Sequence, residues 1–322
     1  MADVVIDPAM HPDDGFHPPT SDDPEWTETC WFTFAVPERN LSGQLYPYFK
    51  PNQGVAAGGA FFWDGRDERP ETCAYAKQFW HLPLPARPLT DIALANGIRY
   101  ECLEPQRQWR VRYDDPDDGD EIHVDLTVTG IVPPNMLGQS HVDQPCRYRG
   151  TIVLHGETIP VDAFGFRDRS WGPRPQFGQG IHGGGSMRGG YSYATAGESD
   201  AFHAITMDFG DGAIAIHGSF LRNGEWSKLR SGTRRVLERD AEAHPLRVEV
   251  TGTDELGRSF TAIGETTNSL AFLINPNLFT INCLTRWSFD GVECWGEDHD
   301  NHSFPDARAL FRAARSSGTD LL

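Results

Sequence analysis

The chain has 322 residues, 39% hydrophobic and 11% aromatic, so it is long enough for two globular domains with substantial cores. Its formal charge of −18, from 46 acidic and 28 basic residues, repels phosphate backbones and argues against nucleic acid as a partner. The 33 glycines and 23 prolines indicate many turns between short strands, which favours β structure.

The N-terminal sequence and the cysteines bear on location. Residues 1–15 are acidic and contain neither a basic leader nor an apolar core, and no run in the chain approaches membrane-spanning length. We therefore predict a cytoplasmic protein without a membrane span. The six cysteines are scattered without CxxC spacing, which is typical of buried thiols. Cys283 and Cys294 fall on consecutive predicted strands, and a disulfide between them is the less favoured alternative.

The first predicted elements are an arm and an aromatic strand. Residues 1–25, rich in proline and aspartate, predict an extended arm with little core of its own. Trp26 to Val36 alternates with aromatic residues on both faces, so neither face is expected to be fully solvated. Glu28 lies within this apolar row, where it is either a structural hydrogen-bond acceptor or a ligand-contacting group.

The strand predicted most clearly covers residues 121–130, where four aliphatic side chains alternate with polar ones. A proline-rich connection over 132–145 follows, and then a further strand. We predict a change of domain near Gly156. This gives an N-terminal β domain over 26–155 and a C-terminal β domain over 156–322.

The run from Val161 to Arg174 carries a carboxylate at the end of an apolar row. Period-two alternation places four side chains on one face: Asp162, Phe164, Phe166 and Asp168. In a closed sheet Asp168 would lie beside an apolar interior, where an ionised carboxylate must be paired, hydrogen-bonded or protonated. It is either held by Arg174 or the Gly172–Pro173 turn, with Trp171 packing beside it, or it is a general acid with a raised pKa.

A glycine-rich segment over residues 178–190 resembles a phosphate-binding loop only superficially. It lacks the Gly-Lys-Ser/Thr ending, and the residues after it predict a strand where a helix is required. We interpret it as a loop at a barrel mouth that carries His182 toward a ligand. Tyr191 and Tyr193 share one face of the following strand and are expected to line the same cavity.

The rest of the chain contains two further candidate residues, His203 and Trp287, and a predicted helix. His203 shares a face with four apolar residues in the strand 201–209, so it is predicted to lie inside, as a core histidine or a proton-transfer group. Trp287 ends an alternating face that begins at residue 279. Residues 304–314 predict a short amphipathic helix.

The cluster from Glu297 to His302 is the one metal candidate in the sequence. His299 and His302 are three residues apart, but the order HExxH is absent. We favour a solvated strand end without a metal. A metal-dependent enzyme using His299 and His302 remains an alternative.

Three blocks carry a resemblance to a known superfamily: residues 164–174 (FGFRDRSWGPR), the pair Gly296–Glu297, and an early block from Trp26 to Gly54. They resemble the double-lipocalin, calycin-like superfamily that includes carotenoid 1,2-hydratases and AttH-like proteins. The resemblance spans about residues 13–300. It implies an all-β fold of two consecutive lipocalin-like antiparallel β-barrels or sandwiches, to which the C-terminal helix is added. Arg169 departs from the hydratase pattern.

We found no dinucleotide fingerprint, phosphate loop or nucleophile elbow, which leaves acid–base side chains as the available chemistry. Together with the resemblance to the hydratase superfamily, this implies a cofactor-independent lyase that adds or removes water or a small fragment on an apolar isoprenoid or aromatic compound. An isomerase or cyclase is a related alternative, and a non-catalytic carrier of a hydrophobic metabolite is a distinct one. A small hydrophobic or aromatic molecule is the expected partner, and a homo-oligomer is left open.

The resemblance also implies roles for individual residues. Asp168 would donate the proton, and His203 or Tyr193 would handle the water or the leaving group. The remaining assignments follow: substrate contacts at Trp171, Tyr191, His182, Trp287 and Glu28, and structural roles for Arg174 and Glu297.

Overall fold

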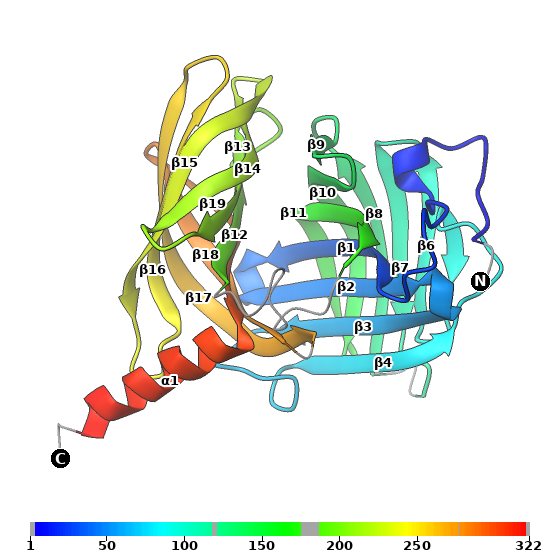
Figure 1. Ribbon diagram of the computed structural model, residues 1–322, viewed down its shortest axis with the longest axis horizontal. Helices are drawn as coiled ribbons and strands as arrows, with labels where there is room; N and C mark the ends of the chain where they lie inside the picture. The colour runs from blue at the N-terminus through cyan, green and yellow to red at the C-terminus, as the bar shows by residue number, and fades with distance from the viewer. Residues whose placement is uncertain (1–3, 118–120, 175–186, 276, 320–322) are drawn as a thin grey trace. The chain divides into compact units, whose positions relative to one another are not determined.

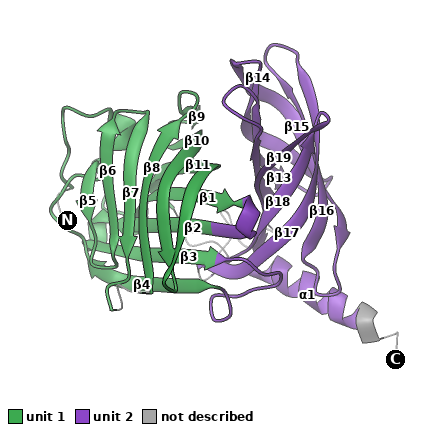
Figure 2. Cartoon of the chain, turned by 180° about the vertical axis from the view of Figure 1, so that it is seen from behind, with its two compact units in different colours: residues 1–36, 43–62, 74–174 green, residues 37–42, 63–73, 175–322 purple. Residues whose placement is uncertain are grey.

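The computed structural model describes residues 4–117, 121–174, 187–275 and 277–319. The chain forms two compact units that interleave in sequence (Figures 1 and 2). The first comprises residues 1–36, 43–62 and 74–174, and the second comprises residues 37–42, 63–73 and 175–322. Within the described residues, no helix is both long and apolar enough to cross a membrane.

The first unit is built on a curled sheet of eleven strands, shown in green in Figure 2. Its order is β4-β3-β2-β1-β11-β10-β8-β7-β6-β5, with β9 paired to β10. The strands are β1 Trp26–Val36, β2 Leu41–Lys50, β3 Val55–Trp63, β4 Tyr75–Pro83, β5 Asp91–Ala93, β6 Ile98–Glu104, β7 Gln108–Asp114, β8 Ile122–Gly130, β9 Asn135–Leu137, β10 His141–Leu154 and β11 Glu157–Pro173. Short 3₁₀ turns occur at η1 Pro12–Asp14, η2 Pro37–Arg39 and η3 Pro51–Gln53.

An aromatic core fills the concave side of this sheet. The ring of Phe32 on β1 lies 4.9 Å from Tyr100 on β6 and 5.8 Å from Trp109 on β7. The alternation predicted for residues 121–130 is confirmed, because the four aliphatic side chains of β8 are buried while the polar ones between them are partly exposed. The predicted arm adds to this core, since Phe16 is buried with its ring 5.0 Å from Phe49.

The first unit continues beyond the predicted change of domain. His155 and Gly156 both have positive φ and form a two-residue turn that joins β10 to β11, with Leu154 paired to Glu157. From there β11 pairs with β10 over its length and with β1 from Gly165 to Pro173. Gly156 is therefore a hairpin turn within the first sheet, and the first unit ends at Arg174.

The second unit is a closed antiparallel barrel whose eight strands pair in sequence order. The strands are β12 Arg188–Thr195, β13 Ala201–Asp208, β14 Ala213–Arg222, β15 Glu225–Arg239, β16 Pro245–Asp254, β17 Ser259–Asn275, β18 Leu278–Phe289 and β19 Val292–Ser303. The predicted C-terminal helix is confirmed as α1, Phe304–Thr319, with the Phe311 ring 5.2 Å from Phe279 on β18. The all-β, lipocalin-like fold with one terminal helix is thus the one predicted.

Candidate functional site

The strand β11 presents its side chains to two different faces of the first sheet. The guanidinium of Arg167 lies 4.7 Å from the ring of Trp109, so Arg167 and, two residues on, Arg169 point into the aromatic interior. Asp168 lies between them in sequence and therefore projects from the opposite, outer face. The prediction that Asp168 lies beside the apolar interior is wrong. Its side chain is nevertheless sheltered, with 14% of its surface exposed.

Asp168 belongs to a cluster of three titratable side chains on the outer face. Asp143 on β10 is its direct cross-strand partner, and His141 lies two residues away on the same face. The Nε2 atom of His141 is 2.8 Å from Oδ2 of Asp143 and 3.6 Å from Oδ2 of Asp168. The side chain of Asp143 is almost fully buried, whereas His141 is 17% exposed. We call these three residues the Asp168 cluster.

Burial and charge set the protonation of the Asp168 cluster. Burial, together with the like charge of Asp143, raises the pKa of Asp168 to about 6 against the attraction of His141. Burial lowers the pKa of His141, but the carboxylates of Asp143 and Asp168 outweigh it and bring that pKa to about 9. At neutral pH the imidazole is therefore cationic, while Asp168 titrates close to neutrality.

Hydroxyl and aromatic side chains adjoin the cluster. Ser170 shares the face of Asp168, and its Oγ is 2.7 Å from Oγ1 of Thr29 on β1. Arg174 donates from Nη2 to the same Ser170 oxygen at 2.5 Å, so its bond is to Ser170 while its charge lowers the pKa of Asp168. Trp31 is the cross-strand partner of Asp168 on β1, and its ring lies 6.2 Å from Tyr46.

Two residues predicted to contact substrate lie on the other face of this sheet. Glu28 is fully buried and forms an ion pair with Arg169, whose charge, against burial, lowers the pKa of the Glu28 carboxyl. The backbone N–H of His17 donates to Glu28 at 2.9 Å, and the His17 ring stacks on Trp171 at 3.8 Å. Glu28 and Trp171 are thus brought together with the N-terminal arm and apart from Asp168.

The structure brings together three of the residues predicted in the second half. Tyr193 on β12 is the cross-strand partner of His203 on β13, and the Tyr191 ring is 4.7 Å from the His203 ring. His203 is buried as predicted, but the barrel interior is formed by its neighbours Phe202 and Ala204. His203 and both tyrosines therefore lie on the outer side of the barrel wall, which corrects the expectation that they line its inside.

The segment from Glu297 to His302 is not a solvated strand end, because it is buried within β19. The Nε2 atom of His299 is 2.7 Å from Glu297, on the outer side of the wall. The Nε2 atom of His302 is 2.9 Å from Asp300, whose partner Arg234 is buried inside the barrel. Residues three apart on a strand face opposite sides, so His299 and His302 cannot bind one ion together.

Trp287 packs inside the barrel, where its ring lies 5.2 Å from Phe202. The buried cluster around it comprises Ala194, Phe202, Ala204, Phe220, Val248, Val250, Phe260, Ala262, Phe289 and Cys294. Trp287 is therefore part of the barrel core, and its contact with a substrate stays a prediction. His182 lies outside the described residues.

Among the described residues, two clusters that each lie within one unit have the composition of a metal site, and in each the ligand atoms lie within 4.8 Å of one another. One is the Asp168 cluster. The other joins His244 with Asp67 and Asp240 in the second unit. The contacts of His141, at 2.8 and 3.6 Å, are those of an ion-paired imidazole, and His244 is likewise ion-paired with Asp67.

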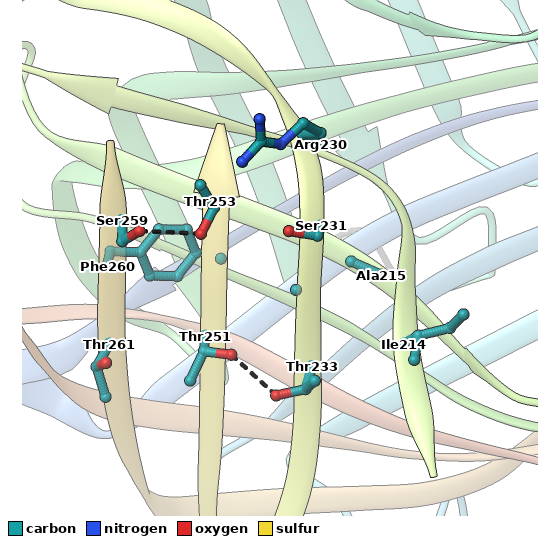
Figure 3. Close-up of a pocket in the computed structure, with 12 residues that line it drawn as sticks. Ile214, Ala215, Arg230, Ser231, Thr233, Thr251, Thr253, Ser259, Phe260 and Thr261 are labelled. Carbon is teal, nitrogen blue, oxygen red and sulfur yellow. Dashed lines mark hydrogen bonds between the residues drawn. The ribbon is translucent and has the colours of Figure 1, made fainter. Parts of the chain in front are cut away.

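A groove of about 610 Å³ lies on the barrel wall over β14 to β17 (Figure 3). Thr233 and Thr251 are hydrogen-bonded across it at 2.9 Å, as are Thr253 and Ser259. The lining consists of hydroxyl and apolar side chains, glycines and Arg230. Because these groups do not titrate near neutral pH, the groove is a weaker candidate for acid–base chemistry than the Asp168 cluster.

His141 and Asp143 were not predicted as site residues, because both lie within the segment 132–145 that was interpreted as a proline-rich connection. In the structure β10 runs through Pro145. The available signal was the spacing HVD, with two titratable residues on one face of a strand, followed by a hairpin turn that pairs residue 143 with residue 168.

Comparisons with known proteins give a family and two similar solved structures. A family model described as a domain of unknown function (DUF7064) matches residues 10–298. No curated protein sequence matches the chain. An AttH-like protein from Nitrosomonas europaea aligns over 88% of this chain and 94% of its own, with 13% identity and a TM-score of 0.54. Kievitone hydratase from Nectria haematococca aligns over 86% and 88%, with 11% identity and a TM-score of 0.48. At 13% identity the AttH-like structure supports the fold alone.

Proposed function

The chain belongs to the DUF7064 family, and from the geometry of the Asp168 cluster we propose that it is a cofactor-independent lyase. In this proposal Asp168 exchanges a proton with a small apolar aromatic or isoprenoid substrate. The reaction is the addition of water to a carbon–carbon double bond, or the reverse elimination.

One observation carries the proposal: a partly exposed carboxyl with a pKa of about 6 beside a histidine and a fully buried second carboxylate. A proton-transfer group works best when its pKa lies near the working pH. With a pKa of about 6, roughly a tenth of the Asp168 carboxyls are protonated at pH 7, so both forms are available.

The cluster can carry a balanced proton cycle. In hydration, the Asp168 carboxyl gives its proton to one carbon of the double bond, which leaves a carbocation at the other. Water adds there and returns a proton to the Asp168 carboxylate. The His141 cation stabilises the carboxylate between these two transfers, and Asp143 orients the imidazole. Aromatic faces such as that of Trp31 stabilise the cationic intermediate.

Asp168 and His141 are the residues on which the proposal rests, with Asp143 as a positioning residue. The roles predicted for His203 and Tyr193 stay predictions. Arg174 donates a hydrogen bond to Ser170, and the structural role predicted for it also stays a prediction.

The test is incorporation of ¹⁸O from labelled water into a panel of small aromatic and isoprenoid alkenes, followed by mass spectrometry. We expect the wild type to label at least one compound and Asp168→Asn to lose at least about a hundredfold in rate. Asp162→Asn is the matched control, because Asp162 lies on the same strand and is exposed and paired with Arg147. Undiminished labelling by Asp168→Asn would refute the role of Asp168. Binding of panel members without labelling would favour the carrier.

A further inference from the structure

The interior of the first unit contains two buried cations. Arg167 and Arg169 have side chains that are 2% and 0% exposed, in a region lined by Trp109 and Phe32. Burying a guanidinium in an aromatic interior is costly unless a carboxylate compensates it. Each of the two arginines therefore needs a carboxylate partner in this interior.

The two arginines obtain their carboxylates differently. Arg169 pairs with Glu28, which belongs to the neighbouring strand β1 of the same sheet. Arg167 pairs with Asp14, which belongs to the N-terminal arm and lies 153 residues earlier in the chain. The other oxygen of Asp14 accepts the backbone N–H of Gln106 at 2.6 Å. The charge of Arg167 is thus neutralised by a group from outside the sheet.

Asp14 uses only part of the binding capacity of Arg167. The bond runs from Nη2 to Oδ1 at 2.5 Å, and Nη1 reaches Oε1 of Gln144 at a long 3.4 Å. The Nε atom of Arg167 is buried and has no hydrogen-bond partner among the described residues. A free carboxylate commonly binds the Nε and Nη2 donors of a guanidinium together. The ring of Trp109, 4.7 Å from the guanidinium, adds an aromatic wall.

We propose that this interior is a binding site for small aromatic carboxylates and that Asp14 occupies it as an intramolecular stand-in for the ligand. The ligand carboxylate bonds to Nε and Nη2 of Arg167, and its ring packs against Trp109 and Phe32. Binding requires the segment around Asp14 to leave, so the arm and the ligand compete for one guanidinium. The site is on the opposite face of β11 from Asp168 and is independent of the proposed lyase activity.

The competition can be measured on the full chain with 4-fluorobenzoate, followed by ¹⁹F NMR. Asp14→Ala removes the competitor, and we expect it to bind the probe at least about tenfold more tightly than the wild type. Asp13→Ala is the matched control, since Asp13 is the neighbouring, more exposed residue of η1 and does not pair with Arg167. The double variant Asp14→Ala/Arg167→Met should not bind the probe. The neutral analogue 4-fluorobenzyl alcohol should show the same affinity for the wild type and for all of these variants.

Thermal unfolding gives a second readout, because Asp14→Ala leaves a buried cation unpaired and is expected to be less stable. Saturating 4-fluorobenzoate should restore its melting temperature, with no such shift in the double variant. If Asp14→Ala does not fold even with the probe, the isosteric Asp14→Asn replaces it in the same titration. Equal affinity of the wild type and the Asp14 variant for the probe, or binding that persists without Arg167, would overturn the proposal. The Asp14–Arg167 ion pair would then have a structural role alone.

Discussion

Asp143 and Asp168 lie directly opposite each other on β10 and β11, and one imidazole, that of His141, contacts both carboxylates. Like charges on directly opposed residues of a sheet are destabilising. The His141 cation between the two carboxylates offsets their repulsion. Burial and the remaining repulsion from Asp143 raise the pKa of Asp168.

The first prediction concerns the charge of His141. Asp143→Asn removes the carboxylate 2.8 Å from Nε2, which is the strongest influence raising the pKa of His141. We expect that pKa to fall from about 9 toward its ordinary value of 6.5. An NMR pH titration of the His141 ring measures it, with Asp162→Asn as the control. An unchanged titration would show that Asp143 does not hold the proton on His141.

The second prediction concerns stability and pH. The pKa of His141 is raised from 6.5 to about 9, so the folded protein holds this proton more tightly than the unfolded chain. Its stabilising contribution is complete below pH 6.5 and is lost as the pH rises to about 9. Urea unfolding at several pH values should show a decline across this window that is smaller in His141→Gln. His123→Gln, at an exposed histidine paired with Asp114, should keep the wild-type decline.

The third prediction concerns the ion pairs inside the barrel. Arg234 donates from Nε and Nη2 to Asp298 at 2.9 and 2.6 Å, and both side chains are buried. Asp298→Ala leaves much of this cation uncompensated and should lower the free energy of unfolding by about 3–5 kcal/mol. Glu293→Ala, at an exposed position of the same strand, should change it by less than about 0.5 kcal/mol. Equal losses in the two variants would show that the network does not stabilise the barrel.

The double variant Asp298→Ala/Arg234→Met separates the cost of an unpaired cation from the value of the pair. Because it removes both charges, it should recover part of the stability lost in Asp298→Ala. The same urea unfolding experiment measures it.

The sequence was sufficient for the elements whose patterns are local. Strand β8 alternates strictly, and α1 has helical spacing, so both were predicted close to their observed bounds. The turn at His155–Gly156 was also visible, but it was interpreted as a domain boundary. Recognised as a hairpin, it would have paired residue 143 with residue 168 by counting outward from the turn.

The orientation of β11 was beyond what a local pattern can give. Phe164 and Phe166 suggested that their face is the interior, yet Arg167 and Arg169 occupy it. Two arginines can turn inward only because Asp14 and Glu28, more than a hundred residues away in sequence, neutralise them. Hydrophobicity within one strand carries no information about such distant partners.

Consecutive positions 167, 168 and 169 divide their chemistry between the two sides of a single sheet, and this makes the spacing from the turn at residues 155 and 156 critical. Inserting or deleting one residue between this turn and residue 167 would turn the side chain of Asp168 inward and those of Arg167 and Arg169 outward. Evolution of this hairpin arm is therefore expected to proceed by replacing residues while its length stays fixed.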